Sequence, residues 1–206
     1  PAKTQSALLE AMQERQVTLD GTAAALPRPF MVLATQNPIE QEGTYALPEA
    51  QLDRFQFKIR IDYPTAEEEA QLTRQVLDGQ TGADLNVDRV STVLDPDALV
   101  AIQRSATQVE ADARVVDYAV AVTRETWQAP ALAAGAGPRG SIALVRGARA
   151  RALAEGRGFV TPDDVKAVAL PALRHRIALS ADADIDGLTA DAILSGILDR
   201  VPAPRS

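Results

Sequence analysis

The sequence predicts an α/β fold that continues into an all-α part. The run Phe30–Thr35 begins with five consecutive apolar residues, as in a strand buried on both faces of a parallel sheet. The pair Asp20–Gly21 is a typical hairpin turn, because both residues tolerate positive φ. From Tyr63 onward, the caps and the apolar spacing are those of helices. We therefore expect residues 1–62 to be α/β and residues 63–206 to be helical.

In the α/β part, local signals mark each element. The apolar residues Ala7, Leu8 and Ala11 share one face of a helix. Pro48 suits the first turn of a second helix, and the residues after Phe57 alternate as in a strand. In order, the expected elements are a helix over 4–14, a hairpin of strands 16–19 and 22–26, a strand over 30–35, a helix over 48–55 and a strand over 57–62. These strands are too few for a complete sheet, so we expect an incomplete parallel sheet with a β-hairpin insertion.

In the helical part, caps and breakers mark the helix ends. Thr65 is a cap followed by acidic residues, and Thr161 is a cap followed by Pro162 and two more acids. Most residues of the segment 130–137 have small side chains, which predicts a flexible connection. The expected helices cover 65–77, 95–108, 112–127, 138–155, 161–173 and 189–198. The inner face of the third of these helices is expected to carry Val115, Val116, Ala119, Val120, Val122 and Thr123.

The composition excludes several classes of function. The 206 residues include no Cys and one His, so a disulfide framework, thiol catalysis and a Cys- or His-rich metal site are excluded, and we expect no metal ligands in the chain. A net charge of −7 argues against non-specific binding of nucleic acid. No apolar run approaches the roughly 18 residues of a membrane span, and no signal peptide is visible. We expect a cytoplasmic protein.

Two polar side chains near the end of the buried strand suggest polyphosphate chemistry, because open α/β sheets bind ligands beyond the carboxyl ends of their strands. The Asn37 amide could orient a water, and the Arg54 guanidinium could neutralise charge on a transferring phosphoryl group. Each residue has a structural alternative. Asn37 favours a turn before Pro38, and Arg54 can pair with Asp53 or Glu49.

Two further side chains are candidates. Arg139 lies in the first turn of a helix, where a cation is unfavourable because the helix N-terminus is already positive. Its presence suggests a nearby anion, for which a phosphate would suit, and the alternative is a solvated Arg beside a Gly-rich loop. His175 could titrate near neutral pH, but a hydrogen-bonded structural histidine is the favoured interpretation.

The usual phosphate-binding signature is absent from this sequence. No segment of the type G-x-x-x-x-G-K-[ST] occurs, and no apolar strand ends in paired acids. The 206 residues alone therefore lack the usual means of holding a triphosphate and its magnesium ion.

Six segments of the chain resemble the same family when they are taken in order. They are Lys3–Glu14, Ala34–Tyr45, Leu47–Phe55, Gly137–Arg139, Val160–Val165 and Leu173–Arg176. Together they closely resemble the MoxR family of AAA+ ATPases, over nearly the whole chain. The resemblance implies the C-terminal part of an AAA+ P-loop core over residues 1–62, followed by an all-α lid domain over residues 63–206.

The resemblance also implies a role for each candidate. Asn37 matches the first sensor, which positions the attacking water. Arg54 matches the arginine finger, which is offered to the ATP of the adjacent subunit. Arg139 matches the second sensor, which contacts the γ-phosphate from the lid. ATP and Mg²⁺ are then the expected ligands, with most of their contacts outside this chain.

Partners follow from the same resemblance. MoxR proteins are similar to chaperones that assemble or activate other proteins, and they usually form hexameric rings. Their partners often contain a von Willebrand A domain. This chain differs from the family pattern in starting just after the expected magnesium-binding motif, so we expect the isolated 206 residues to be inactive. Gly140 and Gly147 stand where Ala is common, and we expect them to loosen the lid helix.

Two other functions remain open from the sequence. The first is a non-enzymatic helical protein-interaction module, in which the lid is a docking platform. The second is a nucleic-acid-associated AAA+ motor, against which the acidic charge balance counts.

Overall fold

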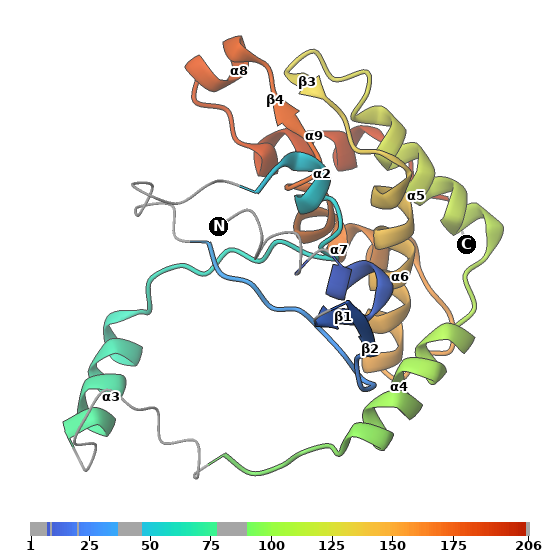
Figure 1. Cartoon of the computed structure of the whole chain (residues 1–206). Coiled ribbons are helices and arrows are strands. Elements are labelled where there is room, and N and C mark those ends of the chain that lie inside the picture. Colours follow the sequence, from blue (N-terminus) through green and yellow to red (C-terminus); the bar gives the residue numbers. More distant parts are fainter. Residues whose placement is uncertain (1–7, 9, 20, 37–46, 78–89, 205–206) are drawn as a thin grey trace.

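The computed structural model of the chain describes residues 8, 10–19, 21–36, 47–77 and 90–204 (Figure 1). Helices predominate, and a short hairpin and a second antiparallel strand pair accompany them. The elements are β1 (Gln16–Leu19), β2 (Thr22–Ala25), α2 (Glu49–Leu52), α3 (Ala66–Leu77), α4 (Pro96–Gln108), α5 (Ala113–Glu125), β3 (Leu132–Ala134), α6 (Pro138–Ala154), α7 (Pro162–Leu173), β4 (Ala178–Leu179), α8 (Ala181–Ile185) and α9 (Ala190–Arg200). Residues 8 and 10–14 are also helical.

The predicted hairpin is confirmed. Strands β1 and β2 pair antiparallel, with Gln16 opposite Ala25 and Leu19 opposite Thr22. Gly21 has φ +78°, a left-handed conformation that glycine adopts without strain.

The predicted parallel sheet does not form within the described residues. The expected strands Phe30–Thr35 and 57–62 are extended, but neither belongs to a ladder. Met31 is 75% exposed and Leu33 is 84% exposed, so the first of them is not buried either. A strand needs a neighbouring backbone for its hydrogen bonds, and in the described part of the chain the only sheets are the pairs β1–β2 and β3–β4.

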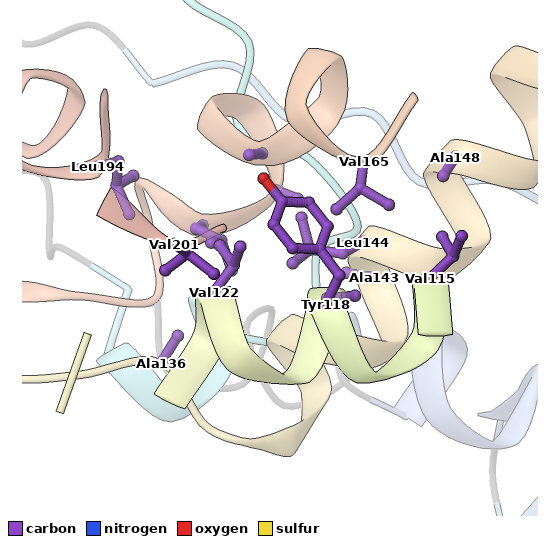
Figure 2. Packing of buried hydrophobic residues seen from close by; sticks show 14 of the residues in the cluster. Val115, Tyr118, Val122, Ala136, Ala143, Leu144, Ala148, Val165, Leu194 and Val201 are labelled. Atoms are coloured by element: carbon purple, nitrogen blue, oxygen red, sulfur yellow. The ribbon is translucent and has the colours of Figure 1, made fainter. Parts of the chain in front are cut away.

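The hydrophobic core lies among α5, α6, α7 and α9, and its residues run from Val109 to Val201 (Figure 2). Leu144, Leu173 and Ile197 are fully buried within it. In Figure 2, the Tyr118 ring points from α5 into this cluster. The buried face of α5 consists of Val115, Tyr118, Ala119, Val122 and Thr123. The expected inner face was therefore wrong at Val120, which is exposed, and it lacked Tyr118.

The predicted helix starts are confirmed where caps marked them. At α7, Thr161 and Asp164 form a capping box, in which the Thr161 N–H donates to the Asp164 carboxylate over 2.8 Å. Arg157 donates to both oxygens of that carboxylate, at 2.8 and 2.6 Å. Burial raises the pKa of Asp164, but the hydrogen bonds from Arg157 and Thr161 outweigh it and leave the pKa below its usual value.

The connection over 130–137 is more ordered than its composition predicts. β3 in this segment pairs antiparallel with β4. The loop is also anchored to α5, because the Ala136 N–H donates to Thr126 Oγ1 over 2.9 Å and the Trp127 indole donates to the Ala136 carbonyl over 2.7 Å. Strands of two or three residues are too short to show a period of two, so the sequence pattern does not mark them.

Two glycines of α6 allow close packing, contrary to the expectation that they loosen this helix. A Cβ at Gly140 would meet Leu173 Cδ2 at 3.0 Å, and one at Gly147 would meet Phe57 Cζ at 2.8 Å. Both glycines are buried. They therefore bring α6 close to α7 and to the segment that follows α2.

Helix α3 stands apart from the other helices in Figure 1, and none of its residues is buried. Among the described residues, no helix combines the length and the apolar character needed to cross a lipid bilayer.

Candidate functional site

Arg54 lies in the turn that ends α2. The turn is closed by backbone hydrogen bonds from the Arg54 N–H to Gln51 over 3.2 Å and from the Phe55 N–H to Leu52 over 3.0 Å. The Arg54 side chain is partly buried, and the carboxamide of Gln13 faces its guanidinium. The turn therefore places this Arg against the N-terminal helical residues.

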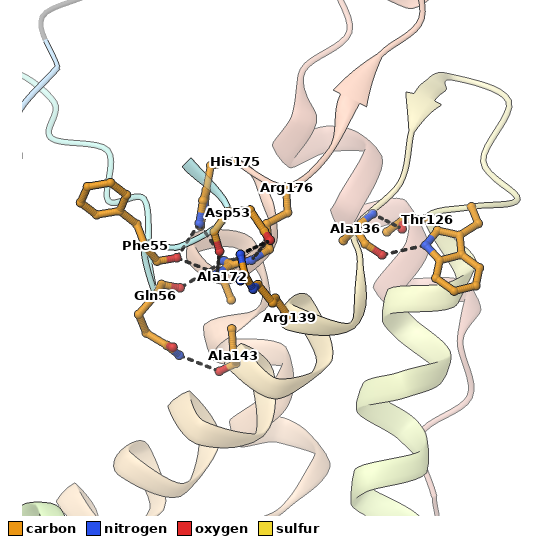
Figure 3. Close-up of polar contacts among 11 residues, drawn as sticks. Asp53, Phe55, Gln56, Thr126, Ala136, Arg139, Ala143, Ala172, His175 and Arg176 are labelled. Carbon is orange, nitrogen blue, oxygen red and sulfur yellow. Dashed lines mark hydrogen bonds and ion pairs between the residues drawn. The ribbon is translucent and has the colours of Figure 1, made fainter. Parts of the chain in front are cut away.

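Arg139 is the second residue of α6. The N-cap, Gly137, has no side chain to accept from the first turn. The Arg139 guanidinium is half-exposed and forms an ion pair with Asp53 Oδ2 over 3.2 Å. In this structure the anion beside Arg139 is the Asp53 carboxylate (Figure 3).

A buried Arg at the end of α7 contacts the same carboxylate. The side chain of Arg176 is 3% exposed and donates to Asp53 Oδ1 over 3.1 Å. It also donates to the carbonyls of Asp53 over 3.0 Å, Phe55 over 2.6 Å and Gln56 over 3.3 Å, and to that of Ala172 (Figure 3). Burial lowers the pKa of Arg176, while Asp53 opposes this shift. The guanidinium remains charged at neutral pH.

His175 is a structural residue, as its favoured interpretation predicted. It is 8% exposed, and its Nε2 lies 2.9 Å from the Phe55 carbonyl. Burial lowers its pKa to about 4, so the imidazole is neutral at neutral pH. His175 is therefore not a pH-sensitive group near neutrality.

Further contacts fix residues 53–58 on the helical body. The Lys58 N–H donates to the Pro171 carbonyl over 2.8 Å, and Arg174 donates to the Lys58 carbonyl over 3.2 Å. The Gln56 side chain donates to the Ala143 carbonyl of α6 over 2.9 Å. Together with Phe57 at Gly147, these contacts hold the segment against both α6 and α7.

The structure thus brings two of the three predicted site residues to one place. Arg54 follows Asp53 in the chain, and Arg139 pairs with the Asp53 carboxylate. The sequence left open that Arg54 pairs with Asp53. In the structure, the ion pairs of Asp53 are with Arg139 and Arg176 instead. Asn37 lies outside the described residues.

Sequence reasoning missed the contribution of Asp53 and Arg176. The one available signal was the run of basic side chains directly after an apolar helix, at Arg174–Arg176. That run identifies the helix end but not its partner, which lies 123 residues away in the chain.

Two family models match the chain. The ATPase family associated with various cellular activities (AAA) matches residues 1–57, and the AAA lid domain matches residues 124–197. The order of the two matches is that of an ATPase core followed by its lid.

Named relatives match almost the whole chain. It is 39% identical to the chaperone MoxR1 of Mycobacterium tuberculosis, over 100% of this chain and 55% of that protein. It is 44% identical to the uncharacterized protein YeaC of Bacillus subtilis, over 98% of this chain and 62% of that protein. It is 28% identical to the protein MoxR of Methylorubrum extorquens, over 96% of this chain and 62% of that protein. The chain therefore spans roughly three fifths of the length of these relatives.

A solved structure shares the fold over the full chain. The crystal structure of a protein assigned as an ATPase, from Cytophaga hutchinsonii, matches with a TM-score of 0.89 and 38% identity. The match covers 100% of this chain and 63% of that one. With the two AAA models and the MoxR relatives, it shows that this chain, the end of an ATPase core followed by a helical lid, belongs to the MoxR family of AAA+ ATPases.

Proposed function

We propose that the protein containing this chain hydrolyses ATP at the interfaces of a ring and uses the energy for chaperone-like assembly or activation of other proteins. The observation that carries the proposal is the position of the Arg54 turn. Asp53, the residue before Arg54, forms an ion pair with Arg139, so this turn and Arg139 lie side by side. Two guanidinium groups at one place, one of them already on a carboxylate, suit a polyanionic ligand.

In this proposal, each candidate residue has one task. Arg54 is offered to the ATP of the adjacent subunit, where it neutralises charge that develops on the transferring phosphoryl group. Arg139 contacts the γ-phosphate from the lid, after leaving Asp53. Asn37 orients the attacking water. ATP supplies the transferable phosphoryl group, and the residues that cradle it and hold Mg²⁺ are proposed to lie mostly outside these 206 residues, which contain no phosphate-loop motif.

The proposed domain boundary lies at residue 62. Residues 1–62 would be the end of the ATPase core and residues 63–206 the lid. The positions of the two model matches, 1–57 and 124–197, support this division. The span of the hydrophobic core, from Val109 to Val201, also supports it.

The proposed assembly is a hexameric ring that acts on a protein partner with a von Willebrand A domain. Both come from the family resemblance, and the name of the MoxR1 relative as a chaperone supports action on other proteins.

The test of this function is the variant Arg54→Ala in the full-length protein. Steady-state ATP hydrolysis should fall by about 10³–10⁵-fold, because an arginine finger contributes that much to phosphoryl transfer. Binding of ATP, measured by calorimetry, should persist. The matched control is Arg60→Ala, since Arg60 is exposed and its ion pair with Asp191, among the described residues, is long at 3.6 Å.

Three results would contradict the proposal. Unchanged ATP hydrolysis by the Arg54→Ala variant would exclude Arg54 as the arginine finger. Absence of ATP-dependent heat in calorimetry of the full-length protein would favour a helical interaction module. Strongly salt-dependent DNA affinity would favour a nucleic-acid motor. The 206-residue chain alone is the negative control and should show no turnover.

A further inference from the structure

One guanidinium group holds the backbone on both sides of Arg54. Arg176 donates to the carbonyl of Asp53, the residue before Arg54, over 3.0 Å, and to the carbonyl of Phe55, the residue after it, over 2.6 Å. It also reaches the Gln56 carbonyl over 3.3 Å. The peptide that carries Arg54 is therefore fixed at both ends by a single planar fork of donors.

The support of this guanidinium is rigid. Arg176 follows α7, whose last residues Ala172 and Leu173 are fully buried in the helical core. Helix α7 starts at a capping box and packs along α6. A side chain that is 3% exposed at the end of such a helix has few rotamers available, so it transmits the position of the lid to the Arg54 turn.

The charge of the guanidinium is compensated at the same place. Asp53 Oδ1 lies 3.1 Å from Arg176 and Asp53 Oδ2 lies 3.2 Å from Arg139. Loss of Arg176 therefore leaves the carbonyls of Asp53, Phe55 and Gln56 without this donor, and Arg139 remains as the partner of the Asp53 carboxylate. Both effects free the turn that bears Arg54.

We propose that Arg176 is a positioning residue for Arg54, which fixes the direction in which the lid of one subunit presents that Arg to the nucleotide of the next. This inference rests on the proposed function, because it needs Arg54 to act across a subunit interface. It assigns a task to the end of α7, which the proposed function leaves without one.

The first experiment separates catalysis from binding. In the full-length protein, Arg176→Gln should lower kcat by about 10²-fold, which is the order of loss that misplacement of a catalytic group by 1 Å produces. The KM for ATP should change little. The matched control is Arg174→Gln, which removes a guanidinium that is 12% exposed at the same helix end and contacts Asp191 and the Lys58 carbonyl instead of the carbonyls on either side of Arg54. Arg174→Gln should lower kcat much less than Arg176→Gln does, because the carbonyls on either side of Arg54 keep their donor.

The second experiment uses mixed rings, because an effect through Arg54 acts on the neighbouring subunit. The variant Asn37→Ala inactivates the ATP-hydrolysis site of its own subunit, and Arg54→Ala inactivates that of the next subunit. Rings mixed from these two inactive variants should regain activity at those interfaces where an intact Asn37 of one subunit meets an intact Arg54 of its neighbour. Arg176→Gln should behave as Arg54→Ala does: activity returns on mixing with Asn37→Ala and does not return on mixing with Arg54→Ala.

Each departure from this pattern overturns the inference. Restoration of Arg176→Gln by Arg54→Ala would show that Arg176 acts within its own subunit, and restoration by neither variant would show that its loss damages more than the presentation of Arg54. If Arg176→Gln does not assemble, Arg176→Lys enters the same mixtures, since Lys keeps the charge but lacks the fork of donors. Failure of the Asn37→Ala and Arg54→Ala pair to complement would instead contradict the proposed function.

Discussion

The Asp53 carboxylate joins residues that lie far apart in the chain. Its two oxygens contact Arg139, 86 residues later, and Arg176, 123 residues later. The sequence marked Arg54 and Arg139 as candidates, because an Arg at a helix start and one after a short helix are visible locally. It could not mark Asp53, since a carboxylate beside an Arg more often pairs with that neighbour than with two distant guanidinium groups.

His175 provides a prediction about pH. Its pKa of about 4 in the folded chain lies below the usual 6.5, so between these values the unfolded chain binds a proton that the folded chain does not. The free energy of unfolding should therefore decrease as the pH falls, by about 1.5 kcal/mol between pH 6.5 and 5. Urea unfolding of the chain, followed by the fluorescence of its single Trp, Trp127, measures this.

The control for this prediction is His175→Gln, which keeps an N–H donor for the Phe55 carbonyl and does not titrate. Its free energy of unfolding should be nearly constant over the same pH range. Because the chain has no other His, an equal pH dependence in the variant would rule out His175 as the source.

At the scale of elements, the sequence predicted helices better than strands. Caps such as Thr161 and Asp112 act on their own helix, so a local pattern is sufficient to locate it. β3 is too short to show a pattern and is identified only by its partner β4. The apolar run Phe30–Thr35 has the composition of a buried strand, but among the described residues it meets no strand to pair with.

Two helical glycines should respond to the same substitution in opposite directions. Gly147→Ala places a Cβ 2.8 Å from Phe57 Cζ and 3.2 Å from Val168 Cγ2. The gain in helix propensity should be exceeded by this overpacking, for a net loss of about 1 kcal/mol. Gly196→Ala meets only Arg200 Nη1 at 3.5 Å, so it should stabilise the chain by about 0.5–1 kcal/mol.

Urea unfolding of the two variants measures both values in one series. Stabilisation of the chain by Gly147→Ala would show that α6 has room at this position. In that case Phe57 would not be the contact that requires a glycine there.

At the scale of the whole molecule, the change to predominantly helical structure was predictable from the sequence, apart from the short strand pair β3–β4. The docking of residues 53–58 onto α6 and α7 was not, because it depends on contacts between the first and last thirds of the chain. These contacts make the Arg54 turn a part of the helical body, although the sequence groups it with the α/β part.

Limited digestion with trypsin should reveal this organisation. The first cuts should fall at Arg60 or Arg74, since 57–62 belongs to no sheet and α3 has no buried residue. The body from α5 to α9 should survive, although α6 alone carries Arg146, Arg149 and Arg151. Mass spectrometry of the fragments identifies the cuts. Cleavage within α6 as early as within α3 would contradict this division of the molecule.

The docking of residues 53–58 relies largely on main-chain oxygens. Arg174, His175 and Arg176 contact the carbonyls of Asp53, Phe55, Gln56 and Lys58. Every residue type has such a carbonyl, so the identity of Lys58 is nearly free to drift during evolution, whereas Gln56 also contributes its side chain, which donates to the Ala143 carbonyl. The three residues that follow α7 have no such freedom. Across distant relatives, selection should therefore constrain one partner of this contact much more strongly than the other.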